Sequence, residues 1–512
     1  MLRLAPATGR KLQAKLCISV IAIVLLGVVD SGRATIKNDA ALWRPRFATP
    51  SIVALDSAAD RQFTAEVRAS SAAKGWSASI GNDLKTWPCQ IASATYSTIN
   101  NGFERGWQIK VGVPTDASPE LFNLSVACNE CASEQPQAVS VIPAYETNFY
   151  ILHITDEQIV NQYHTDPSGQ YYHMVGTWEE MKWMQQPVNL INPRCAIITG
   201  DQIDFNGALD GWNNWANWGY APHGKKTFSA REATDLENRL SALYKDCHRG
   251  YRVAYVQTPG NHDVTPPGKV LYGSTIDWHA TSARIYEEQF GQRDWSFRMG
   301  DFYVLMHDWS SARLRDWAAK DYDAAGHDPM VKFRLIGQHY DKAWNGARTG
   351  NYAFRPAACD LMLIGHGHTS ATIQTSPYCI YEERAAFVYG TAGFFNFQRT
   401  DNGWVCDQTV HAPRNEANDV WPLFTANGLT KKVRANQPDT MNITSRSVTI
   451  TNDLPQNFYD GRVRFLLDKG DYHTVKNGTI LSEYDCAQDT KTAILVRVNI
   501  PATNSITVNI SR

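Results

Sequence analysis

Five short polar blocks, each at or just beyond the end of an apolar run, constrain this chain more than any other feature. Short apolar runs between turn residues are typical of buried strands. In an open α/β sheet, ligands bind outside the carboxyl ends of the strands, so five such ends can meet at one pocket. The runs cover residues 149–152, 196–198, 253–256, 333–336 and 361–364, and the blocks cover residues 156–158, 200–204, 260–263, 337–339 and 365–368.

The blocks carry side chains that bind divalent metal ions. Two such ions about 3.5–4 Å apart need a bridging ligand, and a carboxylate has the two oxygens and the charge for it. Asp201, directly after Gly200, is the expected bridge, and Asp156 is expected to hold the first metal. Neutral nitrogen and amide oxygen donors complete the predicted site: His339 and Asn261 on the second metal, and His366 and His368 on different metals if the backbone turns at Gly367.

His262 is the remaining candidate of the third block, and it is expected to handle protons. A metal pair can clamp a phosphoryl group while a bridging water becomes the attacking hydroxide. An imidazole beside the pair can bind the phosphoryl oxygens or protonate the leaving alcohol as a general acid. The expected reaction is therefore hydrolysis of a phosphate ester, with monoester and diester both open.

The ordered set resembles the calcineurin-like metallophosphoesterase superfamily over roughly residues 148–400. In that family the blocks are usually Asp-x-His, Gly-Asp-x-x-Asp, Gly-Asn-His-Asp/Glu, a lone His, and Gly-His-x-His. The resemblance implies two packed sheets flanked by helices, with the metals at the top edge. It also implies metal ligands at Asp156, Asp201, Asn261, His339, His366 and His368, and His262 as the catalytic imidazole.

Gln158 is the departure from this pattern, because it stands where the family usually has a histidine ligand. Some branches of the superfamily are similar in carrying Gln there, so Gln158 is kept as a predicted metal ligand. An oxygen-richer site shifts the preference toward harder ions, and Mn, Zn, Fe, Ca and Mg all remain open for the two divalent cations.

Two alternatives remain open. Residues 304–307 resemble the Val-x-x-His block of purple acid phosphatases, which makes His307 a rival to His339. We prefer His339, because its separation from His366 fits one strand, a turn and a short helix. The second alternative is a binding protein on a weakened phosphoesterase core, which Gln158 alone encourages.

The N-terminus predicts export. Basic residues precede a mostly apolar stretch, 16–29, and then Gly32-Arg33-Ala34, so residues 1–34 fit a signal peptide and a secreted, periplasmic or extracellular location. Removing it leaves nine of the ten cysteines, for which an exported protein predicts disulfides. The chain has 49 basic and 51 acidic residues and no long run of like charge, so no footprint for nucleic acid or an anionic membrane is expected.

The periodicity of the chain changes twice. Residues 45–145 alternate like strands and predict an N-terminal β-sandwich, residues 148–405 combine strands with helices, and residues 410–512 alternate again as a C-terminal β domain. The expected fold class is α/β: a four-layer metallophosphoesterase sandwich with these two flanking β domains. A phosphate-ester substrate is the expected partner, and the oligomeric state is open.

Overall fold

The computed structural model describes the chain in segments, all of which belong to the unit Ile36–Arg512. The expected signal peptide (1–34), Asp204 and His368 lie outside these segments. The described residues are 36–37, 41–159, 178–203, 230–265, 278–340, 352–354, 356–366, 371–376, 379–383, 393–407, 431–437, 442–488 and 490–512.

The N-terminal region consists of strands whose side chains alternate between a buried and a more exposed face. In β4, for example, Phe63, Ala65 and Val67 share the buried face, as the two-residue period of a strand requires. The strands are β1 (Ile36–Lys37), β2 (Leu42–Arg44), β3 (Ser51–Ala54), β4 (Gln62–Val67), β5 (Ser77–Gly81), β6 (Thr86–Ile99), β7 (Glu104–Gly112), β8 (Leu121–Ala127) and β9 (Cys131–Ile142).

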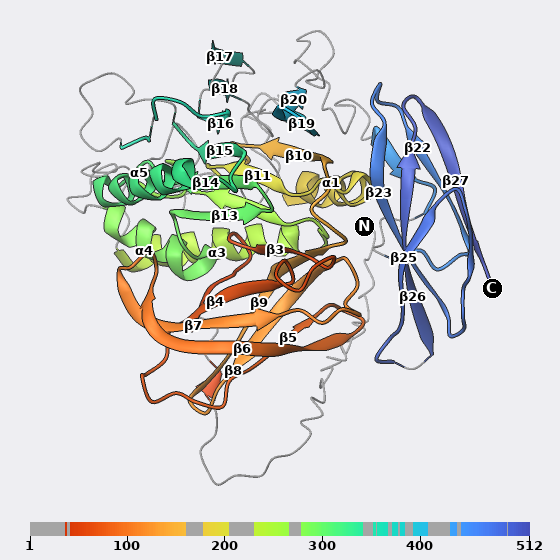
Figure 1. Ribbon diagram of the computed structural model, residues 1–512, viewed down its shortest axis with the longest axis horizontal. Coiled ribbons are helices and arrows are strands. Elements are labelled where there is room, and N and C mark those ends of the chain that lie inside the picture. The colour runs from red at the N-terminus through yellow and green to blue at the C-terminus, as the bar shows by residue number, and fades with distance from the viewer. Residues whose placement is uncertain are drawn as a thin grey trace, which may run out of the picture. The chain divides into compact units, whose positions relative to one another are not determined.

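These nine strands form one continuous, curled network of paired strands, where the sequence predicted a sandwich of two sheets (Figure 1). The cause lies in the long strand β6. Its residues from Thr86 to Cys89 pair with β5, and those from Gln90 to Ile99 pair with β7, across a register shift after Ile91. A bulge bends a strand and increases its twist, so the sheet wraps around one core instead of dividing into two.

The central region contains two sheets packed face to face. One has the order β12-β11-β10-β19-β20 and the other β13-β14-β15-β16-β18-β17. Apolar side chains from both sheets, such as Ile197 and Val304, form one buried cluster between them. The strands are β10 (Asn148–Ile154), β11 (Ala196–Thr199), β12 (Tyr255–Thr258), β13 (Trp295–Met299), β14 (Phe302–His307), β15 (Phe333–Gln338), β16 (Leu361–Ile364), β17 (Ala371–Ser376), β18 (Cys379–Glu383), β19 (Gly393–Thr400) and β20 (Gly403–Asp407).

Helices cover the outer faces of the two central sheets. Side chains of α1 (Trp178–Ile191), α3 (Ala230–His248) and α4 (His279–Phe290) share a core with the outer face of β10 and β11. Side chains of α5 (Ala312–His327) share a smaller core with the outer faces of β14, β15 and β16. The central region is therefore mixed α/β, with helices outside both sheets.

The C-terminal region adds two antiparallel sheets, in the orders β21-β22-β27-β24 and β23-β26-β25. Most of their buried side chains, including Val463 and Ile494, belong to the same apolar cluster as α1 and the outer face of the first central sheet, and Tyr484 and Ala493 belong to the cluster of the N-terminal sheet. This β region therefore does not have a core of its own. The strands are β21 (Val433–Ala435), β22 (Ser447–Asn452), β23 (Phe458–Asp468), β24 (Thr474–Lys476), β25 (Thr479–Asp485), β26 (Lys491–Ile500) and β27 (Asn504–Ser511).

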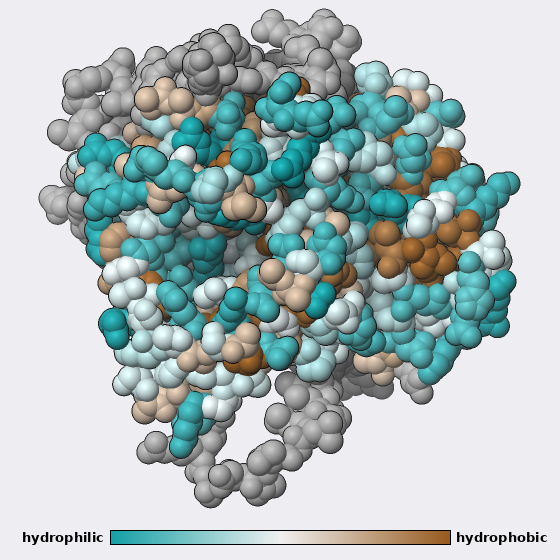
Figure 2. All heavy atoms as spheres, in the orientation of Figure 1, coloured by the Kyte–Doolittle hydropathy of each residue, from teal (hydrophilic) through white to brown (hydrophobic). Residues whose placement is uncertain are grey.

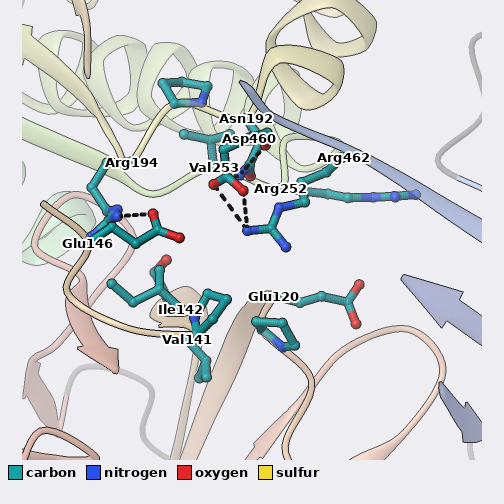
Figure 3. A pocket seen from close by; sticks show the side chains of 14 residues that line it. Glu120, Val141, Ile142, Glu146, Asn192, Arg194, Arg252, Val253, Asp460 and Arg462 are labelled. Atoms are coloured by element: carbon teal, nitrogen blue, oxygen red, sulfur yellow. Dashed lines mark hydrogen bonds and ion pairs between the residues drawn. The ribbon is translucent and has the colours of Figure 1, made fainter. Parts of the chain in front are cut away.

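Charged side chains line a cavity of about 30 Å³ where the three regions meet (Figure 3). Glu120 comes from the N-terminal sheet, Arg194 from the central region, and Arg462 from β23. Figure 3 shows Arg194 beside Glu146 and Arg462 directed at Asp460, with nitrogen–oxygen distances of 2.7 and 2.8 Å. These pairs neutralise charge that would otherwise be buried alone.

Buried Glu237 on α3 predicts a pH-dependent stability. Burial, followed by the charge of Asp263, raises the pKa of Glu237 well above 4.5, and its Oε2 atom has no hydrogen-bond partner among the described residues. The folded state therefore holds a proton that the unfolded state releases, and stability falls as the pH rises from about 4.5 toward the folded pKa.

Glu237→Gln should remove this slope and raise the free energy of unfolding at pH 8 by about 1–3 kcal/mol, because no charge is then buried. Urea unfolding at pH 5 and pH 8 measures both effects. The exposed Glu134→Gln is the control. An unchanged pH slope in Glu237→Gln would show that Glu237 ionises in the fold without cost.

The expectation of export predicts that the cysteines form disulfides. Among the residues that the structure describes, eight cysteines are free thiols, so disulfides remain a prediction. Cys128 and Cys131 flank the turn between β8 and β9 with their Sγ atoms 3.3 Å apart.

None of the described helices is long and apolar enough to cross a membrane. Figure 2 shows a mostly hydrophilic face on which apolar side chains gather over the C-terminal strands.

Candidate metal centre

Parallel strand pairing brings the polar blocks to one edge of the central sheets. Strands β10, β11 and β12 are mutually parallel neighbours, and so are β14, β15 and β16 (Figure 1). Their carboxyl ends therefore face the same edge. Asp156, Asp201 and Asn261 follow the strands of the first sheet, and His339 and His366 follow β15 and β16 of the second.

Asp201, His339 and His366 form the centre of this edge, each with one ligand atom within 4.8 Å of the others. The Nε2 atom of His339 lies 3.3 Å from Oδ2 of Asp201 and 3.0 Å from Oδ1 of Asn261. Asp156 joins the group through its Oδ2 atom, which accepts the backbone N–H of His366 at 3.0 Å. The structure thus brings together donors that are far apart in the sequence.

Gln158 and His262 also lie against the Asp201 carboxylate. The amide nitrogen of Gln158 is 3.4 Å from Oδ2 of Asp201, and the Nε2 atom of His262 is 3.9 Å from the same oxygen. The backbone N–H of His262 donates to Oδ1 of Asp201 at 2.8 Å. His262 is the more exposed of the two, with 28% of its side chain accessible. His368, the remaining predicted ligand, lies outside the described residues.

The backbone around these donors is strained. Ten described residues other than glycine have a positive φ, and four of them are candidate ligands: Asp156 (53°), Gln158 (44°), Asp201 (55°) and His366 (71°). This left-handed conformation costs free energy in a non-glycine residue, and such residues persist at sites where the surroundings demand them. Their gathering at one edge is an independent sign of a functional site.

Glycines allow the loops to approach one another. Gly200 has a φ of 100°, and a Cβ there would lie 2.6 Å from Nδ1 of His339. A Cβ on Gly260 would collide with the Asp201 side chain, and one on Gly365 would lie 2.8 Å from Oδ2 of Asp156. The glycines of the second, third and fifth blocks are therefore needed for the close contact of the donors.

The donor set fits a divalent metal ion. The Nδ1 atom of His339 lies 2.8 Å from the carbonyl oxygen of Thr199, which favours the tautomer with its N–H on Nδ1. The lone pair of Nε2 then points toward Asp201 and Asn261, as in metal-binding histidines whose other nitrogen donates to a carbonyl. One carboxylate oxygen, one amide oxygen and one imidazole nitrogen thus surround one point.

Electrostatics at the centre reflect this crowding. Burial opposes ionisation of Asp201, but the charges of His339 and His262 outweigh it, and the pKa of Asp201 lies well below its usual range. Burial lowers and Asp201 raises the pKa of His339, with a net rise to about 9. Burial and the neighbouring His339 lower the pKa of His366 to about 4. At neutral pH Asp201 is a carboxylate and His366 a neutral imidazole, the forms that bind metals, whereas His339 carries a second proton that a bound cation would displace from Nε2.

Asp263 is a buried residue of the site to which the sequence assigned no role. Its carboxylate accepts the backbone N–H groups of Gly260 at 2.8 Å, Ile203 at 2.9 Å and Gln202 at 3.2 Å. Asp263 therefore ties the loop after β11 to the loop after β12 and places Asp201 beside Asn261. Its place as the last residue of the third block was the signal that it belongs to the site.

The structure places the rival His307 away from the donors. His307 is fully buried at the end of β14, with Nδ1 3.1 Å from both carboxylate oxygens of Asp294 and Nε2 2.9 Å from the carbonyl oxygen of Tyr352. Both ring nitrogens are thus engaged. Among the described residues the metal-binding group contains His339 and not His307.

Comparisons with known proteins give distant structural likenesses. No protein-family model matches the chain, and no curated protein matches it. The chain is similar to a purple acid phosphatase of yellow lupin (Lupinus luteus) seeds, with 12% identity, a TM-score of 0.34 and coverage of 66% of this chain and 67% of that one. It is similar to PhoD, with 7% identity, a TM-score of 0.38 and coverage of 73% and 93%.

A dimetal phosphatase from Danio rerio is also similar, with 11% identity, a TM-score of 0.30 and coverage of 51% of this chain and 95% of that one. These three neighbours are distant from the chain in both sequence and structure. At TM-scores below 0.5 they carry no argument about the chemistry of this chain, which depends on its own donors.

Proposed function

We propose that the protein is a metal-dependent hydrolase of phosphate esters. The observation that carries this proposal is the group formed by Asp201, His339 and His366, joined by Asn261 at hydrogen-bonding distance from His339. Bound there, a pair of divalent cations would polarise the phosphoryl oxygens and make a water acidic enough to attack phosphorus. The chain has nearly equal numbers of basic and acidic residues, so attraction of the negatively charged ester would depend on the cations at this centre.

The residues of the chain have separate tasks in this proposal. Asp201 would hold both cations. Asp156, Gln158 and one histidine of the fifth block would bind the first cation, and Asn261, His339 and the other histidine would bind the second. For Gln158 this requires that its amide oxygen face the cation. His262, anchored through its backbone to Asp201 and partly exposed, is placed to protonate the leaving oxygen of the ester.

The test is a hydrolysis assay with 4-nitrophenyl phosphate and bis(4-nitrophenyl) phosphate. The purified protein is stripped with a chelator and reloaded with Mn²⁺, Zn²⁺, Fe²⁺, Ca²⁺ or Mg²⁺. Turnover that needs metal is expected, and the preferred ester decides between monoester and diester. Metal binding without turnover of any ester would favour the alternative of a binding protein on this core, and failure to bind metal would overturn the proposal.

His262→Gln should lower kcat by about 10²-fold for an alkyl phosphate and much less for 4-nitrophenyl phosphate. The alkoxide needs a proton to leave, whereas nitrophenolate leaves without one. Metal content should stay at the wild-type level. The exposed His327→Gln on α5 is the matched control. An equal loss for both esters would show that His262 binds the phosphoryl group instead of protonating the leaving group.

We also propose that the protein is exported and that residues 1–34 are removed. The basic, apolar and small-residue order of this segment supports the proposal. N-terminal sequencing of protein recovered from the medium or periplasm of an expressing host tests it. Recovery of the intact N-terminus in the cytosol would contradict it.

A further inference from the structure

We propose that Tyr340 is a positioning residue that fixes the amide of Asn261 toward the second metal. This inference rests on the proposed two-metal function and adds to it a residue that neither the blocks nor the family resemblance includes. The hydroxyl of Tyr340 donates to Oδ1 of Asn261 at 2.7 Å. The same oxygen lies 3.0 Å from Nε2 of His339, on the side where the cation would bind.

An asparagine can present either its oxygen or its nitrogen to a cation, and only the oxygen has lone pairs for it. The hydroxyl of Tyr340 donates to the amide oxygen, and turning the amide would end this donation, so the hydrogen bond favours the orientation with the oxygen beside His339. Oδ1 has two lone pairs, so one can accept from Tyr340 while the other faces the metal. Tyr340 thus favours the amide orientation that metal binding requires. It also restricts rotation of the Asn261 side chain before the metal binds, so less conformational entropy is lost on binding.

The ring of Tyr340 is held in place from three sides. It meets the ring of His366 in a tilted arrangement at a centroid distance of 4.2 Å and the ring of Trp309 edge to face at 4.7 Å. It also contacts His339 edge to face at 5.0 Å. Because two of these rings are candidate ligands, movement of Tyr340 would disturb both the amide oxygen and the imidazoles.

The support of Tyr340 extends to the buried pair of His307 and Asp294. Trp309 is 2% exposed, and its carbonyl oxygen accepts the backbone N–H of Tyr352 at 2.6 Å. The carbonyl oxygen of Tyr352 in turn lies 2.9 Å from Nε2 of His307, which is held by Asp294. His307 therefore contributes at a distance from the cations, because it holds Tyr352, which binds the backbone of Trp309, and the ring of Trp309 packs against Tyr340.

Metal titration of Tyr340→Phe tests the proposal with a readout that does not need activity. The stripped protein is titrated with Mn²⁺ and with Zn²⁺ against a chelator of known affinity. Binding of the second equivalent should weaken by about 10–100-fold, the usual effect of losing an outer partner of a ligand, while the first equivalent is unchanged. At limiting Mn²⁺, kcat/KM should fall in parallel and recover when Mn²⁺ is raised.

The double variant Asn261→Ala with Tyr340→Phe tests whether Tyr340 acts through Asn261. If Tyr340 acts through Asn261, adding Tyr340→Phe to Asn261→Ala should change the affinity for the second equivalent no further. Tyr459→Phe is the matched control, because its hydroxyl donates to Oδ1 of Asn148 at 2.9 Å, at the start of β10 and not at the end that Asp156 follows.

Wild-type affinity for both equivalents in Tyr340→Phe would overturn the role of Tyr340 and leave the proposed function standing. An undiminished effect of Tyr340→Phe in the Asn261→Ala background would also overturn it, by showing that the hydroxyl acts independently of Asn261. Absence of metal binding by the wild-type protein would overturn the proposed function itself, and with it this inference.

Discussion

Asp201→Asn is expected to lower kcat/KM by about 10³-fold or more and to abolish binding of at least one metal equivalent. Outer partners of metal ligands alone cost about 10–100-fold, and Asp201 is the proposed ligand of both cations. Asparagine keeps one acceptor for the backbone N–H of His262, which Asp201 binds at 2.8 Å. Asparagine lacks the negative charge and the second carboxylate oxygen. The substitution therefore tests whether residue 201 bridges the two cations, and it should disturb the fold little.

Measurement of metal content by mass spectrometry, together with kcat/KM for the preferred nitrophenyl ester, gives both parts of the result. Asp323→Asn on the exposed face of α5 is the control, with 76% of the Asp323 side chain accessible. Circular dichroism checks that the variant folds. A folded Asp201→Asn protein that retains two metals and most of its activity would exclude Asp201 as the bridge.

Arg464→Ala is expected to lower the free energy of unfolding by about 3–5 kcal/mol, because it leaves a buried carboxylate without its partner. Arg464 is 2% exposed, and it reaches from β23 to Glu120 at 2.9 Å and Asp83 at 2.8 Å in the N-terminal region. Glu120 is itself buried, and the hydrogen bond that it keeps from the neutral hydroxyl of Tyr484 does not replace the lost positive charge.

Urea unfolding measures the effect, and two variants make the test specific. Arg284→Ala breaks the exposed pair with Glu288, at 2.6 Å, and should cost no more than about 0.5 kcal/mol. Arg464→Met combined with Glu120→Leu should recover much of the loss, because the buried pair is removed together and Asp83, with 45% of its side chain exposed, can be hydrated. If Arg464→Ala were no more damaging than Arg284→Ala, the junction between the regions would not depend on this ion pair.

The central fold and most of the candidate site could be predicted from the sequence, for a local reason. An apolar run that ends in a glycine and a polar side chain indicates a buried strand and its exit, whatever the rest of the chain does. Asp156, Asp201, Asn261, His339 and His366 therefore marked five strand ends, and parallel pairing places those ends at one edge. The chemical type of each donor is likewise a property of the residue alone.

The pairing of β6 could not be predicted from the sequence, because alternation shows which side chains are buried but not which strands pair. A bulge after Ile91 lets one strand pair with β5 and then with β7, and the period of two is the same in a curled sheet and in a sandwich. The C-terminal strands likewise gave no sign that Val463 and Ile494 share a core with α1.

By itself the sequence determined the donors, their order and the strands that carry them. The tertiary structure alone decided that Asp263 ties two loops together, that Tyr340 donates to Asn261, and that His307 supports the site from a distance. Each of these is a contact between side chains and loops far apart in the chain. Such contacts depend on how the strands are stacked and on where each loop leaves its sheet, and no local pattern of residues carries that information.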